Sequence, residues 1–113
     1  MIDEQTRILR TVSREKAFYF FTSIGNYTGL SGASLKEFLD RINVVDAKSL
    51  EFHLYRGDFE RWASEVLQDE ELVREVKRLQ RFSLSGEALR NQLSLTVSKL
   101  LKRPTNQSGP SGC

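Results

Sequence analysis

The sequence predicts a mostly α-helical protein, a compact bundle of about five short helices with one small aromatic β-hairpin near the N-terminus. Three observations predict it. Apolar residues recur at helical spacing from residue 34 to residue 101. Serine or aspartate stands at the start of each of these apolar stretches, where a helix cap is expected. The aromatic run over residues 17–22 is the one stretch with strand character.

The strand is expected over Ala17-Phe18-Tyr19-Phe20-Phe21-Thr22, because aromatic side chains suit a pleated surface. The glycine and asparagine that follow indicate a chain reversal, with residues 27–28 on the returning arm. A lone hairpin is only marginally stable. We therefore expect it to lie on helices.

The helix starts are the clearest local signals. Ser34 and Glu37 form a capping box, in which the serine side chain accepts a backbone N–H and the glutamate reaches back to the cap. Asp46 and Asp69 are predicted caps of the same kind, and Gly57 is a predicted helix end. Two further starts are expected at Asp58 and Ser85.

The chain of 113 residues is long enough for one modest core, which we place in a single domain over residues 1–104. A short first helix is expected over residues 3–12. Residues 105–113 are rich in glycine, serine and proline, which is typical of a flexible tail or of a remnant left by cloning.

Charge and cysteine content exclude several classes of protein. Seventeen basic against fifteen acidic residues leave a net charge of +2, so no global field demands a nucleic-acid or membrane partner. No apolar run could span a bilayer, the N-terminus does not resemble a signal peptide, and the single cysteine is Cys113. We expect a cytoplasmic protein without metal, cofactor or disulfide.

His53, Arg56, Asp58 and Trp62 gather within ten residues and invite two interpretations. In the first, His53 is a general acid or base that Asp58 orients across the helix break. In the second, which we favour, Asp58 caps a helix, His53 donates a hydrogen bond to backbone, and Trp62 anchors the core with its indole N–H bonded.

The aromatic run has two faces, because side chains alternate along a strand. If helices cover both faces, the whole run is core, which is the outcome we favour. Otherwise Tyr19 and Phe21, or the alternate residues of the run, form an exposed patch for a partner or a second subunit, with Tyr27 on the returning arm as a further contact.

A basic stripe is predicted on one face of the helix that follows Asp69. Such a stripe could hold phosphates of a nucleic acid, although a solvated helix face is the favoured interpretation. Its members are Arg74, Lys77, Arg78 and Arg81.

Two segments together resemble a family of small archaeal and bacterial domains of unknown function: AFYFFTSIGNYTG over residues 17–29 and SLEFHLYRGDFERW over residues 49–62. The likeness runs from about residue 14 to residue 79 and includes SLKEF at 34–38 and DEEL at 69–72. The resemblance implies an intracellular accessory domain from a prokaryote, and among prokaryotes it favours an archaeon.

The leading functional hypothesis is a non-catalytic interaction or regulatory domain that binds a protein partner or a second copy of itself. Its candidate contact residues are Tyr19, Phe21, Tyr27, His53 and Arg56. The alternatives are nucleic-acid binding through the basic stripe and a small enzyme that uses His53 and Asp58.

Overall fold

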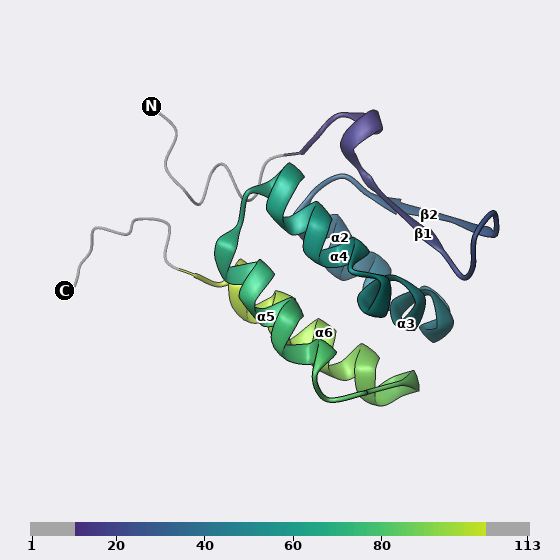
Figure 1. The fold of residues 1–113 in the computed structure, drawn as a ribbon. Helices are drawn as coiled ribbons and strands as arrows, with labels where there is room; N and C mark the ends of the chain where they lie inside the picture. Colours follow the sequence, from purple (N-terminus) through teal and green to yellow (C-terminus); the bar gives the residue numbers. More distant parts are fainter. Residues whose placement is uncertain (1–10, 104–113) are drawn as a thin grey trace, which may run out of the picture.

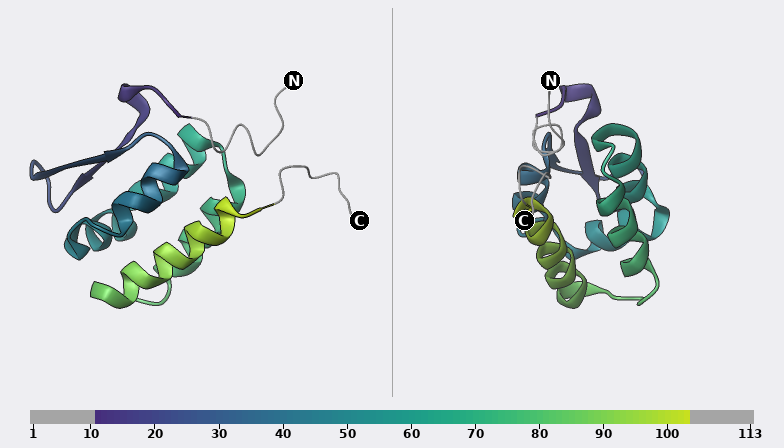
Figure 2. Two further views of the ribbon diagram at one scale, coloured as in Figure 1. Left: turned by 180° about the vertical axis from the view of Figure 1, so that it is seen from behind. Right: turned by 90° about the vertical axis from the view of Figure 1, so that its left-hand side faces the viewer.

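The β-hairpin lies over one side of three helices, and the last two helices cover their other side (Figures 1 and 2). The structure is a computed structural model that describes residues 11–103. Its elements in chain order are the 3₁₀ turn η1 (Arg14–Lys16), β1 (Phe18–Phe21), β2 (Tyr27–Gly32), α2 (Leu35–Ile42), α3 (Ala47–Arg56), α4 (Asp58–Trp62), the π-helical turn η2 (Ala63–Leu67), α5 (Glu70–Gln80) and α6 (Gly86–Leu101).

The predicted fold class is confirmed: five α-helices and one two-stranded antiparallel hairpin make up the part of the chain from residue 11 to residue 103. The hairpin packs on α2 and α3, while α6 packs on α2, α3 and α5. The helix expected over residues 3–12 falls almost wholly outside the described residues, as does the tail 105–113. Within 11–103, no helix has the length and apolar character needed to cross a membrane.

The helix starts predicted at Ser34, Asp46 and Asp69 are confirmed. Each of these side chains accepts a backbone N–H from the first turn of its helix. The Glu37 carboxylate, however, accepts the N–H of Ala33 at 2.8 Å, one residue before the cap. Gly57 ends α3 in the left-handed conformation at φ 84°, as predicted.

The helix starts predicted at Asp58 and Ser85 are confirmed, since α4 begins at Asp58 and Ser85 stands at the N-cap position of α6. The predicted side-chain caps are wrong: Gly57 takes the N-cap position of α4, and the Ser85 side chain makes no cap hydrogen bond. At the start of α6, the Glu51 carboxylate on α3 accepts the Gly86 N–H at 2.7 Å. A carboxylate here satisfies an orphan donor and suits the positive end of the helix dipole. The cap thus comes from a residue 35 positions earlier in the chain.

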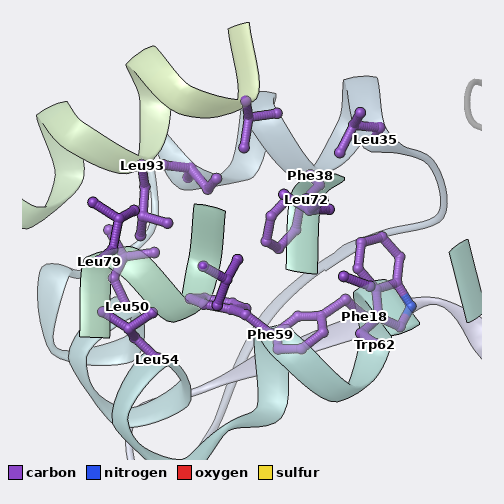
Figure 3. Packing of buried hydrophobic residues seen from close by; sticks show 14 of the residues in the cluster. Phe18, Leu35, Phe38, Leu50, Leu54, Phe59, Trp62, Leu72, Leu79 and Leu93 are labelled. Atoms are coloured by element: carbon purple, nitrogen blue, oxygen red, sulfur yellow. The ribbon is translucent and has the colours of Figure 1, made fainter. Parts of the chain in front are cut away.

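The core of the hairpin side is aromatic (Figure 3). Phe18 and Phe20 on β1 are buried, and Phe18 contacts the rings of Phe38, Phe59 and Trp62 at centroid distances of 5.0–5.7 Å. The indole N–H of Trp62 donates to the Lys16 carbonyl at 2.7 Å, which confirms its predicted role as a bonded core anchor.

The other face of β1 is not covered, so the expectation of a core on both faces is wrong. Tyr19 and Phe21 are only partly buried. Their rings pack instead against Tyr27 across the hairpin, at 5.9 and 5.3 Å between centroids. Alternation along the strand therefore gives the hairpin one core face and one half-exposed aromatic face.

Gly32 ends β2 where the strand meets the start of α2. A Cβ atom at this position would lie 3.0 Å from the backbone N and 3.1 Å from the Cα of Phe38. Both are backbone atoms of a helix, which cannot move aside like the end of a flexible side chain. Only glycine lets the strand and helix approach this closely.

We expect Gly32→Ala to lower the free energy of unfolding by about 1–3 kcal/mol, because the added methyl group overpacks this contact. Chemical denaturation measures the change. The control is Ser31→Ala at the preceding strand position, which removes only a half-buried hydroxyl and should shift stability by less than about 0.5 kcal/mol. Equal effects of the two substitutions would contradict this account of Gly32.

Candidate functional site

A groove of about 550 Å³ lies between the hairpin and the α3–α4–η2 segment. One wall comes from the half-exposed face of β1 and the hairpin turn, and the other from α3, α4 and the π-helical turn. The lining residues are Phe18, Tyr19, Phe21, Ile24, Gly25, Phe52, His53, Arg56, Asp58, Arg61, Trp62, Glu65 and Val66.

His53 joins the two walls at the floor of the groove. Its Nε2 accepts the backbone N–H of Phe21 on β1 at 2.8 Å. Because Nε2 accepts, the ring proton must be on Nδ1, which lies 2.7 Å from Asp58 Oδ2 and donates to it. The ring is 4% exposed and is ringed by aromatic side chains, with Phe18 at 4.8 Å and Phe52 at 4.9 Å.

This environment keeps the imidazole neutral. Burial lowers the pKa of His53 below its ordinary value of 6.5, and together with the nearby charge of Arg56 it outweighs the hydrogen bond to Asp58 and the charge of Asp58, which raise the pKa. Both ring nitrogens are engaged within the protein, so neither can exchange a proton with a bound molecule while these bonds persist. The prediction that His53 donates to backbone is wrong in direction: its ring accepts from the backbone at Nε2 and donates to the Asp58 carboxylate from Nδ1.

Asp58 organises the charged rim of the groove instead of capping α4. Besides His53, its carboxylate contacts Arg56 Nε at 3.4 Å and an Nη atom of Arg61 at 3.2 Å. The Arg56 guanidinium also lies over the Phe52 ring, 4.7 Å from the centroid. Two arginines thus share one carboxylate at the edge of an aromatic surface.

The structure brings together four of the five predicted partner-binding residues. Tyr19, Phe21, His53 and Arg56 all line the groove, and Tyr27 supports it by packing on the rings of Tyr19 and Phe21. Within this set His53 is buried, so only the other four present side-chain surface to a partner.

Sequence reasoning missed the hairpin tip and the π-helical turn as parts of the site. Ile24 at the tip is 85% exposed, an unusual position for a large aliphatic side chain beside a groove. Glu65 and Val66 belong to η2, and π-helical turns are frequent at functional sites. The sequence carried a signal only for the hairpin tip, where Ile24 is an apolar residue inside a turn rich in glycine and asparagine.

The basic stripe lies on α5, away from this groove. Lys77 pairs with Glu60 at 3.7 Å, and Arg78 pairs with Glu75 at 2.8 Å. Arg74 borders a separate hollow of about 460 Å³, and Arg81 is exposed. Half of the stripe is thus engaged with carboxylates, which weakens the field that a phosphate backbone would meet.

The buried imidazole has a testable consequence for stability. In the unfolded chain His53 titrates near 6.5, and in the folded chain its pKa is lower. Below 6.5 the unfolded state therefore binds a proton that the folded state does not, so stability falls as the pH falls from 6.5 toward the lowered value. We expect a slope of up to about 1.4 kcal/mol per pH unit in this range, measured by urea denaturation between pH 7.5 and 5.5.

The matched variant for this pH dependence is His53→Gln. Glutamine keeps a carbonyl oxygen that can accept the Phe21 N–H, but it has no titrating group. Its stability should change little between pH 7.5 and 5.5, since ordinary carboxylates titrate mainly below this range. Parallel slopes for the wild type and the variant would show that His53 is not the group responsible.

Comparison with known proteins adds no assignment to this geometry. No family model matches the chain, and neither a curated protein nor a solved structure has significant similarity to it. The resemblance to small prokaryotic domains stays a prediction from the sequence motifs. Between residues 11 and 103, no three histidine, cysteine or acidic side chains are grouped so that they could hold a metal ion. The function must be inferred from the groove itself.

Proposed function

We propose that this chain is a non-catalytic protein-interaction domain whose groove binds a segment of a partner protein. The observation that carries the proposal is the half-exposed aromatic face of Tyr19 and Phe21, which lines a concave surface next to two arginines. Aromatic and arginine side chains supply most of the binding energy in protein interfaces. The groove presents these residue types on a concave surface that can enclose a bound segment.

The dimensions of the groove support a bound segment of a few residues. Its volume of about 550 Å³ lies within the range of about 300–1,000 Å³ that is typical of ligand pockets. Ile24 extends the apolar wall to the tip of the hairpin. A partner side chain placed between this tip and the ring of Phe52 would lose contact with water on two sides, which favours binding.

A binding role is also supported by the state of His53. It is the only histidine in the chain, and both of its ring nitrogens are bonded within the protein. General acid–base catalysis needs a group that can reach the proton it transfers. The enzyme hypothesis built on His53 and Asp58 therefore loses its central group. The single cysteine and nearly balanced charge favour an intracellular role for the domain.

Peptide selection on the immobilised chain tests the proposal. We expect phage-displayed peptides that bind the wild type to lose at least tenfold in affinity against Ile24→Asp, because a charge replaces the apolar tip of the groove. The control is Val44→Asp, which changes another exposed aliphatic residue, 67% exposed and not among the groove residues. A selection without binders, or binders equally sensitive to both substitutions, would refute the proposal.

Self-association is the version of this function in which the partner is a second copy. It predicts that the mass measured by light scattering rises with protein concentration, and that Phe21→Ser, which removes an aromatic groove wall, abolishes the rise. The control is Phe82→Ser, which removes an equally large exposed ring in the turn after α5, outside the groove lining. A constant monomer mass up to millimolar concentration excludes the second copy and leaves a different protein as the partner.

A further inference from the structure

Four charged residues line the groove: Arg56, Arg61, Asp58 and Glu65. The Asp58 carboxylate accepts from His53 at one oxygen, contacts Arg56 at the same oxygen, and contacts Arg61 at the other. One carboxylate therefore serves two guanidinium groups and an imidazole N–H. This cluster of Arg56, Asp58 and Arg61 therefore carries one net positive charge beside an apolar surface, while the remaining carboxylate of the groove, Glu65, lies on η2.

Both arginines keep unused hydrogen-bonding capacity. A guanidinium has five N–H donors in a planar fork that matches a carboxylate. Arg56 meets Asp58 through Nε and Arg61 through one Nη atom, and the described part of the chain offers no other ion pair to either. Their side chains are 48% and 59% exposed, so a second carboxylate can reach both.

We infer that the partner segment is acidic, with an apolar side chain seated in the groove and an adjacent Asp or Glu paired with Arg56 and Arg61. This inference rests on the proposed function and adds the chemistry of the partner. The Phe52 ring under Arg56 and the carboxylate beside Arg61 hold the two guanidiniums in place before binding. Such preorganisation lowers the entropy lost when the partner's carboxylate binds.

Other ligand chemistries fit the rim less well. A cationic segment would meet the two arginines, and because Asp58 is already paired on both oxygens, only Glu65 would be left to receive it. A nucleic acid would bring several phosphates past Glu65, an exposed carboxylate that lines the same groove. A segment with one or two carboxylates pairs with the arginines and can leave Glu65 in solvent.

Three blocked peptides of the same length test the inference: Ser-Glu-Leu-Phe-Glu-Ser, its counterpart with both glutamates replaced by glutamine, and its counterpart with both replaced by lysine. Binding to the full chain is followed by ¹H–¹⁵N NMR, in which the indole N–H of the single tryptophan, Trp62, reports on the groove. We expect the glutamate peptide to bind about three- to tenfold more tightly than the glutamine peptide at low salt, and the lysine peptide to bind most weakly.

Variants assign this preference to the two arginines. In Arg56→Gln/Arg61→Gln the glutamate and glutamine peptides should bind within about twofold of each other, because the groups that distinguish a carboxylate from an amide are gone. The control is Arg74→Gln/Arg81→Gln, which removes the same charge from α5 and its C-cap and should leave the preference unchanged. Thermal unfolding of both variants shows whether each is folded.

The outcomes separate this inference from the proposed function. Equal binding of the glutamate and glutamine peptides, or a preference that survives in Arg56→Gln/Arg61→Gln, overturns the acidic partner and leaves an apolar binding groove. Tighter binding of the lysine peptide also overturns it. Failure of all three peptides to shift groove signals, with no peptide recovered by selection, overturns the proposed function. Dimers formed through the groove would assign the site to a second copy.

Discussion

The bond from the Phe21 backbone N–H to His53 Nε2 is the polar contact that positions strand β1 on helix α3. A two-stranded hairpin is marginal alone and needs a surface to lie on. Phe18 and Phe20 provide the apolar part of that contact, but apolar packing is non-directional. A buried N–H without a partner would cost about 1–3 kcal/mol, so the imidazole fixes where β1 can sit along α3.

One consequence runs from this bond to the chemistry of the groove. Because Nε2 must accept, Nδ1 carries the proton and needs an acceptor, which is Asp58. Asp58 is then held at the groove edge, where it also contacts Arg56 and Arg61. The residue that locates the hairpin thus also determines which charges border the aromatic surface. Fold and binding chemistry share the same three-residue chain from Phe21 through His53 to Asp58.

Local features of the fold could be predicted from sequence, because they depend on neighbouring residues. The serine and aspartate caps at 34, 46 and 69, the glycine stop at 57 and the aromatic strand each act over a few positions. Long-range polar contacts could not be predicted. Arg90 donates to the carbonyls of Ile42 and Val45 at 2.8 Å, and Arg103 pairs with Asp69 at 2.9 Å. No local rule distinguishes these arginines from solvated ones.

The error at Asp58 has the same physical origin. An aspartate after a helix-ending glycine has the pattern of a cap, and in an isolated peptide it would compete for the first-turn N–H groups. A buried imidazole N–H is a stronger competitor, since leaving it unpaired inside an aromatic cluster costs more than leaving an N–H at a solvated helix end. The groove itself was equally hidden, because its walls come from residues 18–25 and 52–66. The sequence shows which residue types the two segments contain, but not that the segments lie next to each other in the fold.

A groove built between two such segments couples binding to the order of the hairpin. A ligand that touches both Ile24 and Arg56 binds only when the hairpin lies on α3. Its binding free energy therefore stabilises this arrangement in addition to the Phe21–His53 bond. Protonation of His53 acts against the same arrangement, since a proton on Nε2 would face the Phe21 N–H with a second donor. Ligand binding and protonation of His53 are therefore thermodynamically linked. If protonation lowers the ligand affinity by some factor, ligand binding lowers the proton affinity of His53 by the same factor.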